Sequence, residues 1–425
     1  MLFLYELKKI WSIKVLLIIA VFAVLTWFAL LAEGINTYES LRKHGGYGPF
    51  QNEMFGLYGD TLEPEEIEDF DFARRFAEIA AAGDIIIARE SELFAKYGLA
   101  NFLEYIEWSE DDDLWLLISG SEEDEIMRDK LLMDAVMLER SPITETQSPE
   151  EWWSAPPLDE WYESPFSLWY SLKNLENRYV THIYHETHFI NLENRPVVRR
   201  AAKEILEREN NSLIPNHLMD VFSLYAATAG VFAVAAVMLL VIPLLITDRS
   251  RKINMLQYSS MAGRKVFKIQ FAATLTSAFI LSLILTAVLF APLVKAAAEY
   301  WNASIFHGGI VFVWLYDITF GQYVLLLAGM IIASCVGAAG FAFILARFSS
   351  NIVGVMIKAV PAGATLCVLT AYAVNLALAD MNFFFNAIFG GRFDMPEIIV
   401  CGAIGLVGVT VSALVVRRER RVDLL

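Results

Sequence analysis

Six long stretches of this chain contain no Asp, Glu, Lys or Arg, and they constrain its fold more than any other feature. They have 18, 27, 26, 29, 21 and 19 residues and cover residues 15–32, 221–247, 269–294, 318–346, 359–379 and 398–416. A bilayer core roughly 30 Å thick is crossed by a helix of about 20 apolar residues. The strands of a membrane β-barrel would instead have about 10 residues of alternating polarity. The sequence therefore predicts an all-α membrane protein with six transmembrane helices.

Residues 33–217 separate the first stretch from the other five and hold 39 of the 49 carboxylates in the chain. Residues 34–217 have a net charge of −22, so the rest of the chain is positive although the total is −16. This acidity argues against a nucleic-acid partner and favours cationic ligands or simple solubility. All three cysteines (Cys335, Cys367 and Cys401) lie in the predicted spans, so no disulfide is expected in this segment. We predict one water-facing domain, residues 33–217, inserted between transmembrane helices 1 and 2.

Within this domain, apolar residues three and four apart predict helices at residues 64–81, 86–107, 122–140 and 197–210. Short strands fit residues 114–119 and 178–190, so the domain is expected to be mostly helical, of the α or α+β class. The prolines that indicate loops are Pro142, Pro149, Pro156, Pro157 and Pro165. The helix from Val197 is expected to run toward the second span and to break at Pro215, which would tie the domain mechanically to residues 218–425.

The positive charges gather at one set of span ends, which marks the cytoplasmic side of a membrane protein. This set contains Lys8, Lys9, Lys14, the loop at residues 248–268, Arg347, Lys358, Arg417, Arg418, Arg420 and Arg421. The short loops on the opposite side contain only Lys295 and Arg392. We therefore expect a multi-pass protein of the cell membrane with both termini in the cytoplasm and residues 33–217 outside.

Residues 1–14 have the pattern of a helix that lies in the inner membrane interface, with apolar residues on one side and lysines on the other. The stretch 15–32 is predicted to be a permanent anchor, because its 18 residues exceed the roughly 7 to 15 of a signal peptide. A cleaved signal ending near Ala29 and Ala32 is the alternative, and it would leave five spans.

Few residues have a pattern suited to catalysis. The chain has no G-x-x-x-x-G-K-[ST] phosphate loop, and Gly263-Arg264-Lys265 lacks both the first glycine and the final Ser or Thr. We therefore expect no ATP hydrolysis by this chain and no enzymatic activity of its own. His182, His185 and His188 are three residues apart, but on a helix the outer two would lie about 120° apart. They fit one metal ion poorly, so no metal is expected.

The predicted spans carry no carboxylate at their centres, where proton- or sodium-coupled carriers usually place one. The energy for any transport should then come from a partner. Small residues are frequent in the later spans, and they predict close helix packing rather than a substrate groove. They are Gly329, Ser334, Gly337 and Gly340 in the fourth span and Gly402, Gly405 and Gly408 in the sixth.

Three cytoplasmic and external fragments together resemble the permease subunits of ABC exporters of the ABC-2 type. The N-terminal helix carries Glu6, Leu7, Lys8 and Lys9 before Trp11, and the loop at 248–268 carries Ser259, Ser260, Gly263 and Arg264, followed by Lys268 and Gln270. The apolar run at residues 382–391 fits the family's external re-entrant segment, expected here at 380–396 with Phe383, Phe384, Phe385, Phe389 and Gly390. The resemblance covers nearly the whole membrane part.

The resemblance implies that the loop at 248–268 couples the permease to a separate cytoplasmic ATPase. The residues expected to form this contact are Asp248, Arg249, Arg251, Ser259, Ser260, Gly263, Arg264, Lys265 and Lys268. The partner would bind ATP and Mg, and this chain would hold no cofactor. A second permease, identical or related, and the lipid bilayer complete the expected partners, and the uncharged spans suit export of an amphipathic or hydrophobic peptide, lipid-like molecule or drug.

The chain departs from the family at two points. The family's coupling loop usually opens with Glu and a Gly-Thr pair, whereas this chain has Asp248 and no glycine until Gly263. The domain at 33–217 is also much larger than in compact exporters, so the substrate class is not carried over.

Two other functions stay open from the sequence. The chain would be a receptor or scaffold if it transmits ATPase-driven motion to the external domain without transport. It would be a membrane enzyme if carboxylates and the three histidines of the external domain formed a catalytic site.

Overall fold

A computed structural model describes residues 2–44, 48–110, 129–138 without 131 and 135, 163–180, 195–208, 212–250, 261–306, 313–349 and 351–419. The chain divides into two compact units. We call residues Met1–Glu39 together with His188–Leu425 the membrane unit, and residues Ser40–Thr187 the acidic unit. The described residues are mostly helical and contain no strand, only isolated bridges such as Trp314 with Ala379.

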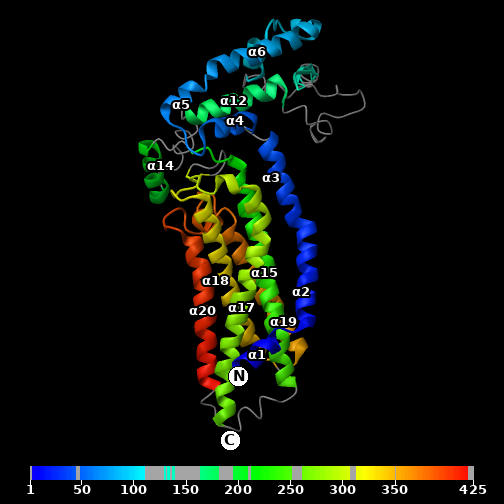
Figure 1. The fold of residues 1–425 in the computed structure, drawn as a ribbon, viewed down its shortest axis with the longest axis vertical. Coiled ribbons are helices and arrows are strands. Elements are labelled where there is room, and N and C mark those ends of the chain that lie inside the picture. The colour runs from blue at the N-terminus through cyan, green and yellow to red at the C-terminus, as the bar shows by residue number, and fades with distance from the viewer. Residues whose placement is uncertain are drawn as a thin grey trace. The chain divides into compact units, whose positions relative to one another are not determined.

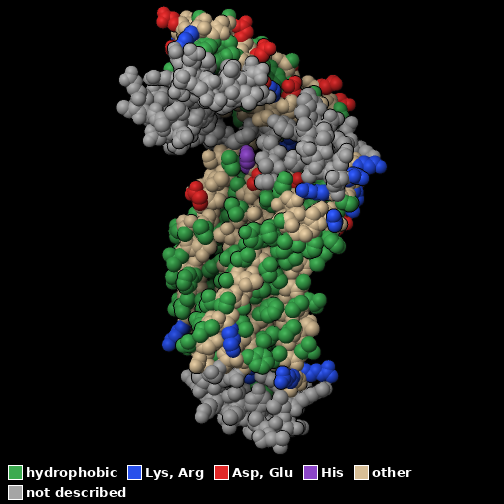
Figure 2. All heavy atoms as spheres, turned by 180° about the vertical axis from the view of Figure 1, so that it is seen from behind, with side chains coloured by type: hydrophobic (Ala, Val, Ile, Leu, Met, Phe, Trp, Pro, Cys, Tyr) green, Lys and Arg blue, Asp and Glu red, His purple; other side chains and the backbone are tan. Residues whose placement is uncertain are grey.

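Six helices among the described residues are long and apolar enough to cross a membrane, which confirms the predicted number of spans and is the pattern of a multi-pass membrane protein. They cover Ile13–Arg42, His217–Pro243, Val266–Ala296, Phe320–Arg347, Ile352–Val374 and Pro396–Arg418. In Figure 2 hydrophobic side chains cover the visible face of these helices, and lysine and arginine side chains appear near their ends.

The long helices of the membrane unit run alongside one another (Figure 1). Its elements are α1 (Leu2–Ile10), α2 (Ile13–Thr26), a π-helical turn (Trp27–Leu31), α3 (Ala32–His44), α14 (Pro196–Arg208), α15 (Asn216–Ser250), α17 (Met261–Ala296), α18 (Phe320–Arg347), α19 (Ile352–Val374), a second π-helical turn (Phe384–Ile388) and α20 (Pro396–Glu419). The proximal end of the bundle holds α1 and the last turn of α20. The distal end, opposite to it, holds residues 212–220, 297–306, 313–320 and 375–397.

The central helix of the bundle is α18, which contacts α15, α17, α19 and α20. It begins with a capping box, in which the Thr319 side chain accepts a hydrogen bond from the Gln322 amide and the Gln322 side chain accepts one from the Thr319 amide. The first span is peripheral by contrast, because only 11% of its most apolar window is buried inside the protein. The second, third and fourth spans form the core of this unit, with 78%, 50% and 56% of the corresponding windows buried.

The predicted close packing is present between α18 and α20. A Cβ built on Gly337 would lie 2.3 Å from the carbonyl oxygen of Ile404, and one on Gly340 would lie 2.4 Å from that of Gly408. The Ser412 hydroxyl donates hydrogen bonds to the Gly340 and Gly408 carbonyl oxygens at 2.8 and 2.6 Å. The two backbones touch because these positions carry no side chain.

At the distal end, α14 lies on the loops that join the spans. Its apolar residues Val197, Val198 and Ala201 belong to a buried cluster with Phe306, Val313, Leu315 and Phe385. Arg200 donates to Asp394 at 2.6 Å, and this guanidinium holds the pKa of Asp394 below its usual range. As predicted, a helix begins near Val197 and a break at Pro215 precedes α15, yet α14 belongs to the membrane unit.

The acidic unit consists of short helices packed through aromatic rings. They are α4 (Gly48–Tyr58), α5 (Pro64–Asp69), α6 (Phe72–Arg89), α7 (Ser91–Ala95), α8 (Phe102–Ser109) and α12 (Pro165–Tyr179), with helical residues also at 129–130, 132–134 and 136–137. The rings of Phe76 and Trp169 lie 4.6 Å apart, and those of Phe102 and Trp169 lie 5.6 Å apart. Gly83 makes room for this packing, since a Cβ there would lie 2.2 Å from the Phe102 ring.

Two predicted helices of this unit are wrong in their extent. The helix expected at 64–81 is interrupted at Phe70, because Asp71 has a φ of 53° and caps the new helix α6 by accepting from the Arg74 amide. The helix expected at 86–107 is three helices, α6 to α8, separated at Glu90 and around Gly98, whose φ is 73°. Helical periodicity alone did not reveal these local breaks.

Two further predictions in this unit are corrected at the ends of α12. Pro165, expected in a loop, is the first residue of α12, where its missing N–H costs no hydrogen bond. Arg178 and Tyr179, expected in a strand, form the last turn of the same helix. The strand expected at 114–119 lies outside the described residues.

Replacing Gly340 with alanine should destabilise the bundle, because the new Cβ would overlap the backbone of α20. Overpacking of this kind costs about 1–3 kcal/mol. We expect the purified protein to unfold several degrees below the wild type in a thermal melt. Gly402→Ala on α20 is the matched control, since nothing lies within 4 Å of its Cβ position. Equal melting temperatures for the two variants would contradict the backbone contact.

Candidate functional site

The residues predicted to contact an ATPase lie at the proximal end of two long helices. Asp248 and Arg249 belong to the last turn of α15, and Gly263, Arg264, Lys265 and Lys268 belong to the first turns of α17. Arg251, Ser259 and Ser260 lie outside the described residues. The helices have 35 and 36 residues, which correspond to about 50 Å each at about 1.5 Å per residue. Each runs without interruption from the distal end to the basic loop.

Two neighbours hold the proximal half of α17. The Trp11 indole N–H, just after α1, donates to the Ser277 hydroxyl in the middle of α17 at 3.1 Å. Arg347 at the end of α18 donates to the Gln270 side chain at 3.1 Å, and its guanidinium lies 4.3 Å from the centre of the Phe267 ring. A displacement of α17 as a rigid helix would therefore be felt by both α1 and α18.

The predicted N-terminal helix is α1, which packs against α17 and α15. Its residue Glu6 is buried, with Lys9 at 4.0 Å, whereas Lys8 is exposed. The exposed apolar side chains of α1 include Leu2, Leu4 and Tyr5. Its position in a membrane interface stays a prediction.

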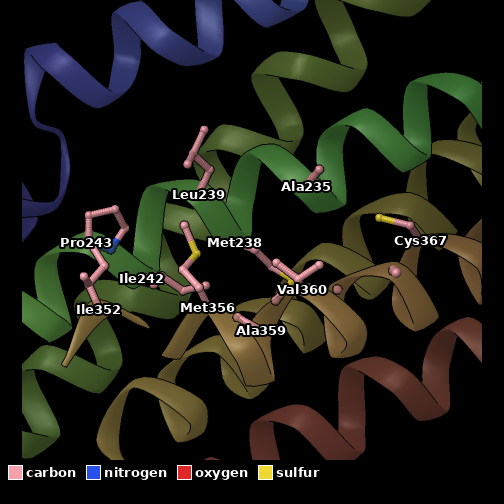
Figure 3. Close-up of a pocket in the computed structure, with 12 residues that line it drawn as sticks. Ala235, Met238, Leu239, Ile242, Pro243, Ile352, Met356, Ala359, Val360 and Cys367 are labelled. Carbon is pink, nitrogen blue, oxygen red and sulfur yellow. The ribbon is translucent and has the colours of Figure 1, made fainter. Parts of the chain in front are cut away.

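An apolar pocket of about 290 Å³ lies between α15 and α19 (Figure 3). No lining residue is charged, and the residues are Ala235, Met238, Leu239, Ile242 and Pro243 of α15 with Ile352, Met356, Ala359, Val360, Gly363, Ala364 and Cys367 of α19. Sequence reasoning missed this pocket, because it favoured packing over a groove. Small alanines and Gly363 leave the space, and the two methionines can adapt their shape to an occupant.

Both walls of the pocket contain a proline inside a helix, Pro243 in α15 and Pro361 in α19. A proline removes one backbone hydrogen bond and strains the preceding turn, so a helix bends more easily there. The pocket volume lies near the lower limit of about 300 Å³ for small-molecule sites. Its size and lining suit one hydrocarbon chain or one apolar side group rather than a bulky polar molecule.

The segment predicted to be re-entrant, residues 380–396, forms a compact turn at the distal end. Phe384 and Phe385 are buried in a π-helical turn, Phe383 packs on Tyr372 with ring centres 4.5 Å apart, and Gly390 has a φ of 58°. Phe389 contacts the Phe393 ring. The depth of this segment in a membrane stays a prediction.

Buried polar side chains hold the turn that follows α19. The Asn382 side chain donates to the carbonyl oxygens of Tyr372, Ala373 and Asn375 and accepts from the amides of Phe384 and Phe385. Leu378 has a φ of 66°, which is unusual for a branched residue, and its amide donates to the Glu397 carboxylate at 2.7 Å. Asp380 accepts from the Val313 amide at 3.1 Å. This turn is thus fixed by buried side chains together with the isolated backbone bridge between Trp314 and Ala379.

Asp220, Asp380 and Glu397 are carboxylates of the distal end that the sequence reading did not single out. Each one ended a charge-free stretch, so each was counted as a boundary rather than as part of a span. Asp380 and Glu397 are almost fully buried, and Asp220 is half-buried. Their burial could have been suspected from the sequence, because each carboxylate directly adjoins a predicted span and has small, apolar or aromatic neighbours.

His182, His185 and His188 lie outside the described residues, so the structure does not bear on a metal there. Among the described residues no group of three or more His, Cys, Asp or Glu side chains converges as a metal site would require. No family model, no curated protein and no solved structure matches this chain. Its function must therefore be argued from its own residues.

Filling the pocket should exclude a hydrocarbon ligand. A photoactivatable probe with one acyl chain, added to protein in lipid nanodiscs, should label the lining of the wild type near Met238 and Met356. Ala364→Trp should lower this labelling at least fivefold, because the indole would occupy the space. Val368→Trp is the control, since Val368 is exposed on the same helix but does not line the pocket. Undiminished labelling of Ala364→Trp, read out by mass spectrometry of the peptides, would argue against a binding pocket.

Proposed function

We propose that this chain is the membrane-spanning permease subunit of an ATP-driven exporter and that a separate cytoplasmic ATPase supplies its energy. The observation that carries the proposal is the pair of continuous helices α15 and α17, which join at the basic loop and extend through the bundle. A helix of about 20 residues suffices to span a bilayer, so both helices reach well beyond it at their ends. Such helices can transmit a displacement of the loop to the distal end of the bundle.

The charges of the loop support a protein partner at this end. Arg249, Arg264 and Lys265 flank the loop on α15 and α17, and would face acidic side chains or helix C-termini of the ATPase. Trp11 then links the middle of α17 to the end of α1, and Arg347 links α17 near its start to α18. The proposed cycle begins with ATP-driven closure of two ATPase subunits, which moves these connected helices together.

The pocket between α15 and α19 would receive the substrate. The lining of the pocket is uncharged. One wall of the pocket is α15, so a movement of this helix changes the shape of the pocket directly. An amphipathic peptide, a lipid-like molecule or a hydrophobic drug could place an apolar part there. The proposed assembly is a dimer of permease subunits, identical or related, in the cell membrane with both termini in the cytoplasm.

Reversing three loop charges tests the coupling. The amount of ATPase that co-purifies with the triple variant Arg249→Glu, Arg264→Glu and Lys265→Glu should be at least tenfold lower than with the wild type, because like charges would then face each other. The ATPase for this experiment is the phosphate-loop protein that co-purifies with the wild-type chain from its native membrane, co-expressed with each variant. Arg417→Glu with Arg418→Glu, which reverses exposed charges at the same end, should leave the association unchanged.

Unchanged association in the triple variant would reject the coupling role of the loop. Vesicles reconstituted with the intact complex then separate export from signalling. ATP-dependent accumulation of a fluorescent amphiphile inside inverted vesicles supports export, and ATP hydrolysis without such movement supports the receptor or scaffold alternative.

A further inference from the structure

Positive charge is concentrated at one place in the most acidic segment of the chain. Residues 34–217 have a net charge of −22, yet residues 195–203 contain four basic residues and no acidic one. This stretch covers the beginning of α14, which belongs to the membrane unit, and the next residue, Glu204, is half-buried. Such a local reversal of charge favours an anionic partner at this helix.

One side of α14 is already occupied by the protein. Its apolar residues Val197, Val198 and Ala201 are buried against the distal loops. Arg199 and Lys203 are four residues apart, so they share a face of the helix, and both are exposed. On the helical wheel this face lies opposite the buried apolar residues. We call it the basic face of α14.

Two contacts place the basic face at the end of the sixth span. Arg200 donates to Asp394 at 2.6 Å, and Asp394 lies two residues before α20 begins at Pro396. Arg195 packs on Gly391, since a Cβ there would lie 2.8 Å from the Cδ atom of the arginine. In Figure 2 a group of Lys and Arg side chains lies at the upper edge of the hydrophobic surface, at the height that α14 has in Figure 1. The basic face therefore lies where a span would leave the hydrocarbon of a bilayer.

Apolar side chains are exposed near the basic face. Phe393, next to Asp394 in the chain, is 56% exposed, and Ile388 in the π-helical turn before it is 54% exposed. Arg392, directly before Phe393, is exposed as well. The exposed apolar surface continues on α20 with Ile399. Exposed aromatic and basic side chains together at the end of a span are typical of a membrane interface.

We propose that the basic face of α14, together with Arg392 and Phe393, is a docking surface for the anionic headgroups of phospholipids in the leaflet at the distal end. Arg199, Lys203 and Arg392 would meet the phosphates, because an anionic leaflet attracts basic side chains. Phe393 would enter the boundary between headgroups and acyl chains. An acidic protein surface would match the charges but not the exposed apolar side chains. The surface does not depend on the proposed exporter function.

Hydrogen exchange of the full-length protein in nanodiscs tests this surface. Peptides that cover residues 196–204 should exchange about threefold more slowly in discs that contain phosphatidylglycerol than in discs of phosphatidylcholine alone, because bound headgroups oppose local opening of α14. High salt should remove this difference, since it screens the attraction. Soluble glycerol phosphate added to the phosphatidylcholine discs should not slow the exchange.

The triple variant Arg199→Gln, Lys203→Gln and Arg392→Gln should exchange equally fast in both kinds of disc, because its charges are lost while the buried side of α14 is unchanged. Arg417→Gln with Arg418→Gln, which removes exposed charges at the proximal end, should retain the protection by phosphatidylglycerol. Equal exchange of the wild type in both lipids, or continued protection of the triple variant, would overturn the proposal. Protection by soluble glycerol phosphate would assign the face to a free phosphate and would overturn it as well.

Discussion

Contact between helix backbones holds the membrane unit together. In hydrocarbon, burial of an apolar side chain against another helix gains little, since lipid tails are equally apolar, so van der Waals contact and hydrogen bonds must provide the attraction. The glycines of α18 and α20 allow this contact, and Ser412 adds hydrogen bonds across it. Because α18 also touches α15, α17 and α19, the position of every later span depends on this central helix.

This arrangement leaves different parts of the bundle with different freedom. The α18–α20 contact is tight, whereas α15 and α19 enclose an apolar pocket and each contain a proline beside it. In its proximal half α17 is fixed to its neighbours by Trp11 and Arg347. At the distal end Asn382 fixes the turn after α19 through buried hydrogen bonds. The proposed exporter cycle would move the adaptable pair, α15 and α19, beside the rigid pair, α18 and α20.

Much of the membrane part could be predicted from the sequence, because the cost of charge in hydrocarbon leaves a direct mark on it. The six spans follow from the charge-free stretches, and the glycines of α18 and α20 follow from their spacing. The same rule concealed Asp220 and Glu397, since a search for stretches without charge must stop at a charged residue even when that residue is buried. The pocket could not be predicted either, because it depends on which faces of α15 and α19 meet. In the acidic unit, the positive φ of Asp71 and the role of Pro165 as a helix start are local features that periodicity does not encode.

In the proposed exporter, the basic loop faces an ATPase inside the cell while the acidic unit lies outside. Labelling of single cysteines in intact cells with a membrane-impermeant maleimide tests this orientation, after Cys335, Cys367 and Cys401 have been replaced by alanine. We expect Ser91→Cys, in the exposed part of α7, to be labelled in intact cells and Ser259→Cys to be labelled only after the membrane is opened. Labelling of Ser259→Cys but not of Ser91→Cys in intact cells would contradict it.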